Sequence, residues 1–431
     1  MFALNRKPLK PLRLKWLTHY YQWRCEHSQQ PPMLTTRTDS RIAVLSFLVL
    51  LTAGCGGEDS ASIPSTSTPS ACTPASTPEF AYMLSGDAVS MYTVNSCSGS
   101  FTPIAAGSVA TGSSESEPEP TPESMIVDPE GRFAYVANLV SNSADEAMIS
   151  MYTIDARTGV LTPTSPATVR TGFYPQGMAI SPSGNFVYTA NSDDNTISMF
   201  TVDSTTGVLT PTSPAAVTAG WSPLSVTVDP SGRFAYAANQ DDNTVSMYNI
   251  NPNTGILTPT TPATVPTEVS PFGVTIDPSG KFAYVPNTYS NGNTVSQYTI
   301  DSVTGVLTPN SPATVTAGKQ PTAVGVDPFG RFAYVVNRAD DTVSMFTIDP
   351  QTGTLAANGV IAAGSQSFRI VFDPSGKFVY VVNETSAASV YTINSDGTLA
   401  AVGVTGSANG ALSMAVTAPT RDYPAPSSLT P

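Results

Sequence analysis

The sequence contains the pattern Phe-x-Tyr seven times, and this repeat constrains the fold more than any other feature. Successive copies are separated by 46 to 53 residues. A repeat of this length is typical of proteins built from stacked units, because one unit alone cannot bury its apolar face. The copies are Phe80-Tyr82, Phe133-Tyr135, Phe186-Tyr188, Phe234-Tyr236, Phe282-Tyr284, Phe332-Tyr334 and Phe378-Tyr380.

Each repeat divides into four strands, as the unit from 222 to 268 illustrates. An inner strand, Ser225 to Val228, precedes an Asp-Pro-Ser-Gly turn and a second strand, Arg233 to Ala238. The third strand, Thr244 to Ile250, has apolar residues on both faces, so other sheets must cover both of its sides. A short outer strand, Ile256 to Thr258, and a Pro-rich crossover complete the unit. Four antiparallel strands per unit are typical of a propeller blade.

The two ends of the repeat region complement each other. The first unit starts at Glu79 with a second strand and has no inner strand before it. After the seventh unit, Ala411 to Thr417 repeats the inner-strand pattern and then stops. We therefore predict an all-β fold, a seven-bladed β-propeller with four antiparallel strands per blade, whose first blade is closed by the C-terminal strand. Without that closure the ring would expose a strand edge and an apolar face.

The N-terminal region predicts export. Arg37 and Arg41 precede an apolar run, Ile42 to Leu51, which is followed by small residues and Cys55. This is the pattern of a secretory signal, and the run is too short for a transmembrane helix. The segment ending at Cys55 resembles the lipobox of bacterial lipoproteins, which implies a lipid on Cys55 and, with Gly56 next, the outer membrane. Ordinary secretion with a free Cys55 is the alternative.

The chain is expected to have four regions. Residues 1–54 form the signal region. Residues 1–32 are interpreted as a start-site error, because Met33 would begin a signal of ordinary length, or as an unusually long n-region. Residues 55–78 form a lipid-anchored flexible linker of Ser, Thr, Pro and Gly. The propeller spans 79–418, and 419–431 is a C-terminal tail. Cys72 and Cys97 form a disulfide in an oxidising compartment or remain two free thiols.

The repeat resembles a known family. Tyr135-Val136-Ala137-Asn138, Tyr188-Thr189-Ala190-Asn191 and Tyr334-Val335-Val336-Asn337 are similar to the Tyr-Val-Thr-Asn repeat of lactonase-type seven-bladed propellers. That family includes 6-phosphogluconolactonases and is similar to muconate cycloisomerases. The resemblance covers all seven blades and implies the fold; for activity it implies lactone chemistry at the mouth of the central channel. The matching residues themselves are ones that build blades.

The candidate site comes from positions where the repeat is broken. Arg369 stands at an inner-strand position that is small in the other blades, so it is a candidate ligand contact, or it pairs with a neighbouring acid or carbonyl. One residue earlier in each blade, Glu123 and Gln176 are the polar exceptions among mostly apolar residues. We assign Glu123 and Arg369 as candidate catalytic residues, with Glu123 as general base. Gln176, Arg338 and Arg369 are the candidate ligand-binding residues.

Other recurring residues are interpreted as structural. Paired loop acids cap turns rather than bind calcium, which would need six to eight oxygens on one ion. The repeated methionines pack between blades, and the Asn that ends each second strand forms a turn. We expect no metal and no cofactor. The loop acids are Asp145-Glu146, Asp193-Asp194, Asp241-Asp242 and Asp340-Asp341; the methionines are Met91, Met151, Met199, Met247 and Met345; the asparagines are Asn138, Asn191, Asn239, Asn287, Asn337 and Asn383.

Charge and composition indicate which kinds of partner and activity the protein can have. From residue 56 onward there are 11 basic and 30 acidic residues, a net charge of -19, which disfavours nucleic acid and anionic membrane surfaces as partners. Enzymes of the resembling family use histidine, and the sequence has none after His27. The near-uniformity of blades 3 to 5, in which the segments LTPTSPAAV, LTPTTPATV and LTPNSPATV recur almost unchanged, favours a scaffold. We therefore predict a monomeric surface module that binds a protein or glycan, with hydrolysis of a small-molecule lactone as the alternative.

Overall fold

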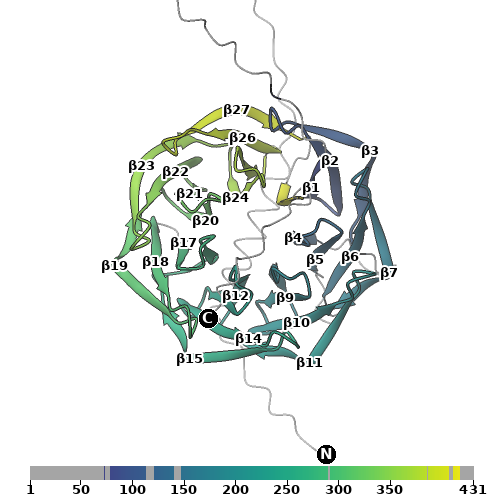
Figure 1. Ribbon diagram of the computed structural model, residues 1–431, viewed down its shortest axis with the longest axis horizontal. Coiled ribbons are helices and arrows are strands. Elements are labelled where there is room, and N and C mark those ends of the chain that lie inside the picture. Colours follow the sequence, from purple (N-terminus) through teal and green to yellow (C-terminus); the bar gives the residue numbers. More distant parts are fainter. Residues whose placement is uncertain are drawn as a thin grey trace, which may run out of the picture. The chain divides into compact units, whose positions relative to one another are not determined.

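The computed structural model describes residues 72, 78–112, 121–139, 147–289, 292–385, 387–406 and 411–417. These residues form 28 strands in seven four-stranded antiparallel sheets, arranged as a ring of blades (Figure 1). The signal region, Cys55, most of the linker and the tail lie outside the described residues, as does Asp145-Glu146. Within the described ranges there is no helix, and so none long and apolar enough to cross a membrane.

Each blade runs from an inner strand beside the axis to an outer strand at the perimeter (Figure 1). In order of blades 1 to 7, the inner strands are β28 (Ala411–Val416), β4 (Thr121–Val127), β8 (Pro175–Ile180), β12 (Pro223–Val228), β16 (Thr275–Ile276), β20 (Pro321–Val326) and β24 (Ser367–Phe372). The second strands are β1 (Glu79–Ser85), β5 (Phe133–Leu139), β9 (Phe186–Asn191), β13 (Phe234–Asn239), β17 (Phe282–Asn287), β21 (Phe332–Asn337) and β25 (Phe378–Asn383).

The third and outer strands complete the blades. The third strands are β2 (Ala88–Val94), β6 (Met148–Ile154), β10 (Thr196–Val202), β14 (Thr244–Ile250), β18 (Thr294–Ile300), β22 (Thr342–Ile348) and β26 (Ala388–Ile393). The outer strands are β3 (Phe101–Ala110), β7 (Leu161–Arg170), β11 (Leu209–Thr218), β15 (Leu257–Pro266), β19 (Leu307–Thr316), β23 (Leu355–Ala362) and β27 (Leu399–Thr405).

The C-terminal strand closes the ring as predicted. β28 pairs antiparallel with β1, and Met83 lies opposite Met414. Beyond the last pair, Thr417 donates its backbone N–H to the Phe80 carbonyl, and its hydroxyl accepts the Phe80 N–H at 2.9 Å. The first and last segments of the repeat region are therefore held in one sheet.

The outer strands are longer than the sequence predicts. β15 extends to Pro266 and includes the Pro-rich stretch that the sequence analysis assigned to a crossover. An outer strand pairs on one side only, so a proline can occupy it without breaking a ladder hydrogen bond. The predicted end of the outer strand at Thr258 was therefore wrong, because the strand continues through the prolines to Pro266.

Phe-x-Tyr joins each blade to the next one. The Tyr135 hydroxyl donates to the Gly207 carbonyl in the turn between the third and outer strands of blade 3, at 2.9 Å. The Phe133 ring lies so close to the same glycine that a Cβ on Gly207 would approach it to 2.4 Å. Burial raises the pKa of the Tyr135 phenol, so the hydroxyl is a neutral donor. We call this arrangement the Phe-Tyr latch.

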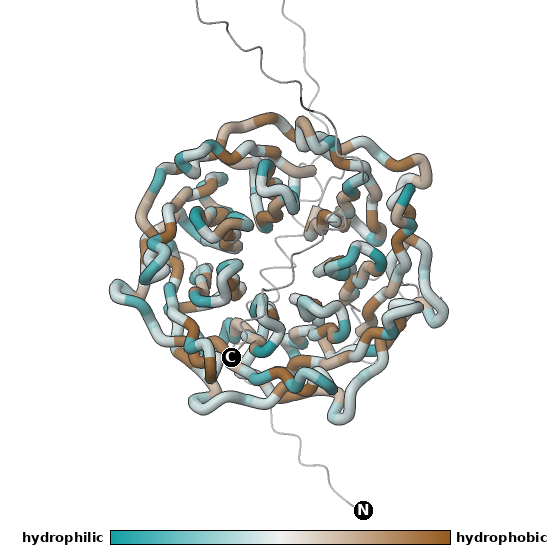
Figure 2. Tube along the Cα trace, in the orientation of Figure 1, coloured by the Kyte–Doolittle hydropathy of each residue, from teal (hydrophilic) through white to brown (hydrophobic). Residues whose placement is uncertain are grey.

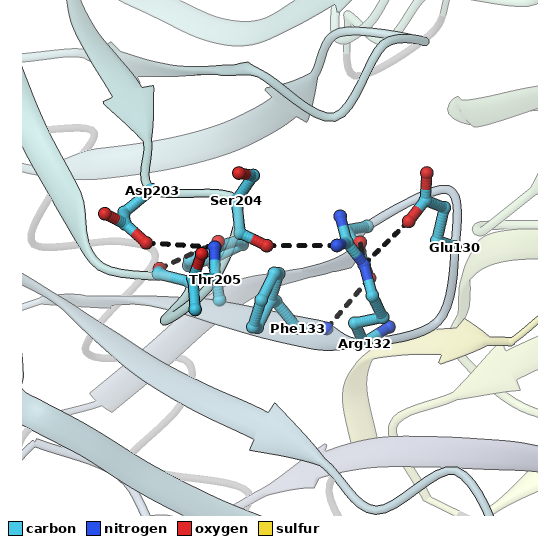
Figure 3. A network of polar contacts seen from close by, with 9 residues as sticks. Glu130, Arg132, Phe133, Asp203, Ser204 and Thr205 are labelled. Atoms are coloured by element: carbon cyan, nitrogen blue, oxygen red, sulfur yellow. Dashed lines mark hydrogen bonds and ion pairs between the residues drawn. The ribbon is translucent and has the colours of Figure 1, made fainter.

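The latch recurs at six of the seven blade interfaces, with O···O distances of 2.7 to 2.9 Å. Arg132 strengthens it in blade 2, since its guanidinium donates to the Ser204 carbonyl of blade 3 at 3.0 Å and pairs with Glu130 at 2.8 Å (Figure 3). Apolar side chains of both blades fill each interface, and apolar segments accordingly recur in every blade (Figure 2). The repeat thus encodes the contacts between blades as well as the blades themselves.

The methionines lie between blades, as predicted, and make a polar contact there. The Met247 sulfur accepts the backbone N–H of Leu307, the first residue of the next outer strand, at 3.2 Å. Blade 5 has Gln297 at this position, and its side-chain oxygen accepts the N–H of Leu355 at 2.7 Å. The equivalent contact is made by Met91, Met151, Met199 and Met345.

The closing interface, between blades 7 and 1, is built differently. The buried Tyr380 hydroxyl has no hydrogen-bond partner among the described residues, although Phe378 still lies against Gly99. Val390 stands where other blades have Met or Gln, and the N–H of Phe101 is bound by the Thr405 hydroxyl at 2.6 Å. The Phe101 and Tyr380 rings lie 4.9 Å apart.

A disulfide joins Cys72 to Cys97 in the turn between β2 and β3. This turn is the one that contains Gly99, so the disulfide ties the segment preceding β1 to the part of blade 1 that meets blade 7. Of the two alternatives left open by the sequence, the structure has the bonded pair.

Candidate functional site

The candidate residues lie at one end of the ring, which we call the mouth face. Here the crossover loops, which lead from an outer strand to the next inner strand, meet the loops between second and third strands. Backbone hydrogen bonds join the two loops of a blade, for example Gln240 to Ser222 and Arg338 to Gln320, both at 3.0 Å. The loops therefore form a connected rim around the inner strands.

The loop acids hold this rim together. The Asp194 carboxylate accepts the backbone N–H of Phe173 in the crossover loop of its own blade at 2.7 Å. Asp242 and Asp340 accept the N–H of Trp221 and Lys319 in the same way. These contacts agree with the predicted capping role. Among the residues that the structure describes, no group of three or more His, Cys, Asp or Glu is placed to hold a metal ion.

The next residue of the same loop reaches the following blade. The Asn195 side-chain oxygen accepts the N–H of Ser222 in blade 4 at 2.8 Å, and Asn243 does the same for Ser270 in blade 5 at 2.7 Å. Asp341 accepts the N–H of Gln366 in blade 7 at 2.7 Å. Two consecutive residues per loop therefore fix the crossover loop within a blade and the one in the next blade.

The repeated asparagines are buried anchors rather than the turn-formers predicted. Asn239 is the last residue of β13 and is fully buried. Its amide donates to the Ser246 hydroxyl on β14 at 2.8 Å, and five other blades repeat this contact. The sequence shows that these positions recur, but it does not show that a serine on the next strand supplies the partner.

Arg369 spans the blade that the C-terminal strand completes. Its Nε donates to the Leu412 carbonyl in blade 1 at 3.1 Å, and its Nη2 lies 3.4 Å from the Glu123 carbonyl in blade 2. The side chain is half-buried. Arg369 therefore reaches the backbone of Glu123, and both of its contacts are of the carbonyl kind that the structural alternative for Arg369 predicts.

Arg338 lies beside the same region. It pairs with Glu384 of blade 7 at 2.8 Å, and the two side chains are only 19% and 17% exposed. Its guanidinium carbon and that of Arg369 lie 5.6 and 5.7 Å from the centre of the Phe368 ring. Two cations thus flank one aromatic ring, an arrangement stabilised by the ring's negative faces.

An aromatic contact at the mouth was not predicted. Phe272 of blade 5 meets Phe368 of blade 7 edge to face, with ring centres 5.2 Å apart. Thr322 holds the equivalent position in the intervening blade 6 and is 4% exposed. In an alignment of the repeats all three residues fall at the position of Glu123 and Gln176, but this alignment does not show that the two rings meet across blade 6.

The described contacts connect the candidate residues of blades 2, 6 and 7. Glu123 and Arg369 are linked through a backbone carbonyl, and Arg338 joins them through Phe368. Gln176 is half-buried on β8, an inner strand that packs next to β4. The arrangement offers the Glu123 carboxyl group, the Arg369 guanidinium, the Arg338–Glu384 ion pair and the Gln176 amide around a partly apolar surface.

Comparison with known families decides the assignment of the fold. The family described as "Lactonase, 7-bladed beta-propeller" matches residues 75–222, 214–312, 258–367 and 309–415. The chain belongs to this family. The match runs through all seven blades, as the resemblance of the repeat implied.

Solved structures share the fold of this lactonase-family propeller. One is a Bacteroides uniformis protein provisionally assigned as a 6-phosphogluconolactonase, with a TM-score of 0.67 and 21% identity over 79% of this chain and 99% of that one. Another is the periplasmic gluconolactonase of Pseudomonas aeruginosa, with a TM-score of 0.64 and 20% identity over the same shares. Identities this low establish the fold alone. No curated protein gives a significant match.

Proposed function

We propose that the protein is a lactone hydrolase whose active site lies at the mouth face between blades 2 and 7. Membership of the lactonase family favours this activity over the scaffold role that the uniform blades suggested. The observation that carries the proposal is the reach of Arg369 across blade 1 to Glu123. This contact places a permanent cation beside the backbone of Glu123, the residue that carries the one carboxylate in the ring of mouth positions.

The two residues have complementary roles in ester hydrolysis. Glu123 accepts a proton from water, whose oxygen attacks the lactone carbonyl. Arg369 stabilises the negative charge that develops on the carbonyl oxygen. When the intermediate collapses, the ring C–O bond breaks, the leaving alkoxide takes the proton, and the product is a hydroxy acid. Arg338 and Gln176 orient the substrate through its polar groups.

The lack of histidine after His27 is consistent with these roles of Glu123 and Arg369. A carboxylate serves as a general base when substrate binding excludes water around it, because desolvation raises its basicity. Phe368, which contacts both Arg369 and Phe272, supplies apolar surface for that purpose. A lactone without a phosphate group suits the acidic protein better than a phosphorylated one.

The test is hydrolysis of a lactone panel by the full chain and three variants. We expect Glu123→Gln and Arg369→Lys each to lower kcat/KM at least about 100-fold, the size typical of losing a general base or an oxyanion contact. Arg233→Ala is the matched control, since Arg233 also bridges blades through a carbonyl, that of Ser302, but at the opposite face. Equal activity in all three variants, or no hydrolysis of any lactone, would contradict the proposal.

We also propose that the protein is exported to the cell envelope and carries lipid on Cys55. The signal-like segment supports export, and so does the Cys72–Cys97 disulfide, because such bonds persist in oxidising compartments. Labelled palmitate should enter the protein in growing bacterial cells and should be lost in Cys55→Ala. Equal labelling of the variant would contradict lipidation at this residue.

A further inference from the structure

The crossover loops of blades 3, 4 and 5 present large apolar side chains to solvent at the mouth face. Phe173, Trp221 and Val269 occupy the same loop position and are 38%, 55% and 48% exposed. Tyr289, in the neighbouring loop of blade 5, is 48% exposed. Scattered apolar residues on a surface need no explanation, but residues that recur at one position of consecutive repeats form a patch. We call Phe173, Trp221, Val269 and Tyr289 the aromatic arc.

The backbone under this arc is fixed. The N–H groups of Phe173 and Trp221 are bound by Asp194 and Asp242 at 2.7 and 2.6 Å. The residue that follows each of them has a positive φ, 57° at Tyr174 and 56° at Ser222. The loops therefore present these residues from backbones of the same fixed conformation, and little backbone entropy would be lost when a ligand binds.

The arc is continuous from blade to blade. Asn195 in blade 3 binds the N–H of Ser222, the neighbour of Trp221, and Asn243 in blade 4 binds the N–H of Ser270, the neighbour of Val269. The N–H of Thr288, next to Tyr289, donates to the Ser270 carbonyl at 2.8 Å. Each exposed apolar residue is thus linked to the next through a hydrogen-bonded backbone.

The charges around the arc indicate what it binds. The mouth-face loops of blades 3 to 5 contain no Lys or Arg, and they contain Asp193, Asp194, Asp241, Asp242 and Glu268. At the equivalent crossover position, blade 6 has Lys319 instead of an apolar residue. Aromatic faces and carboxylates both attract cations, whereas an anionic partner would be repelled.

We propose that the aromatic arc is a docking surface for a basic, extended peptide segment of another protein, whose Lys or Arg side chains lie on Trp221, Phe173 and Tyr289. The alkyl stems of those side chains cover the aromatic faces, and their charged ends approach the loop carboxylates. The surface is separate from Arg338 and Arg369, which lie on blades 6 and 7 and would repel such a segment.

The chain offers its own reporter for this interaction. The sequence has three tryptophans, Trp16, Trp23 and Trp221, so a Trp16→Phe/Trp23→Phe variant of the full chain fluoresces from the arc alone. We would titrate it with a short peptide of alternating Lys and Ser, with the Glu-Ser counterpart, and with a neutral oligosaccharide. The Lys-Ser peptide should change the emission of Trp221 and should bind more weakly as salt rises from about 0.05 M to about 0.5 M.

Substitution separates the arc from the general acidity of the protein. With calorimetry as the readout, Trp221→Ala and Trp221→Lys should each weaken binding of the Lys-Ser peptide at least about fivefold, since a cation–π contact is lost. Phe329→Ala is the matched control, because Phe329 is 61% exposed at the opposite face and its removal should leave affinity unchanged. Equal weakening in all three variants, undiminished binding in the Trp221 variants, or preferential binding of the oligosaccharide would overturn the proposal.

Discussion

Two kinds of blade interface occur in this propeller, and they differ in how they are held. At the six regular interfaces the Phe-Tyr latch and a Met or Gln side chain bind the next blade. At the closing interface the Tyr380 hydroxyl has no partner in the described part of the chain, and the disulfide to Cys97 lies beside the contact. Interfaces within the continuous repeat depend on many small non-covalent contacts, whereas the junction of the chain ends also uses a covalent bond.

Removing the closing strand should have the largest effect. Deletion of residues 411–431 would expose the edge of β1 and the apolar residues that pack in one cluster with Met414, among them Met83. We expect loss of the cooperative thermal transition and aggregation, because the exposed edge and apolar face can pair with other chains. Deletion of 418–431 alone removes none of the described strands, and it should preserve the transition measured by circular dichroism.

The glycine of the latch should be the next most sensitive position. Gly207→Ala places a Cβ about 2.4 Å from Phe133 at a positive φ of 73°, and we expect a cost of about 3 kcal/mol or more. Gly107 has nearly the same φ, 74°, but open space around it, so Gly107→Ala should cost only about 1 kcal/mol. Urea denaturation measures both. Equal costs would mean that backbone strain, not the Phe133 contact, determines the requirement for glycine.

The two kinds of interface can be compared directly through their tyrosines. Tyr236→Phe removes the donor to the buried Gly305 carbonyl and should cost about 1 to 2 kcal/mol. Tyr380→Phe removes a buried hydroxyl that makes no hydrogen bond to the described residues, and the change in stability should be within about 0.5 kcal/mol or favourable. The same denaturation assay distinguishes them. A larger loss for Tyr380→Phe would show that the closing interface has a polar contact of its own.

Acid should weaken the regular interfaces slightly more than the closing one. In the turn that receives the latch of blade 2, hydrogen bonds from the backbone of Thr206 and Thr205 lower the pKa of Asp203 below its usual value. Its contribution is therefore present above the pKa of the unfolded chain, near 3.8, and is lost as pH falls through the lower folded value. The equivalent acids of blades 2, 5 and 6 behave alike, whereas blade 1 has Asn95 there; these acids are Asp155, Asp301 and Asp349.

The matched variant replaces Asp203 and its three equivalents with Asn. Blade 4 already has Asn at this position, Asn251. Between pH 5 and pH 3, the variant's thermal midpoint should fall less than that of the unmodified protein, by a small margin because the carboxylates are exposed. An identical fall in both proteins would assign the acid sensitivity to other carboxylates.

The sequence predicted the fold well because the same strand pattern occurs in every blade. Seven copies of Phe-x-Tyr, with a strand pattern around each, indicated the number of blades, and the extra strand after Ala411 indicated how the ring closes. The partners of these residues were not predicted. The Tyr135 hydroxyl binds a carbonyl 72 residues away, and spacing along a chain does not specify which turn a side chain reaches.

The candidate site was predicted only where it departs from the repeat. Arg369 and Glu123 were identified because their neighbours in other blades differ from them, and the structure connects the two. The contact between Phe272 and Phe368 depends on the width of the ring, which no local pattern encodes. The ion pair of Arg338 likewise was not predicted, because its partner Glu384 lies in the next blade at a position that the sequence analysis does not single out.

The latch has a direction, since at each of the six regular interfaces the tyrosine of one blade binds the turn of the next blade along the chain. A gene segment that encodes one complete blade therefore brings one donor and one acceptor, and its duplication or loss leaves no interface of a new type. Tandem copying can thus change the number of blades without redesigning the contacts between them. The outer segments of blades 3 to 5, which recur almost unchanged, have the sequences expected of copies made in this way.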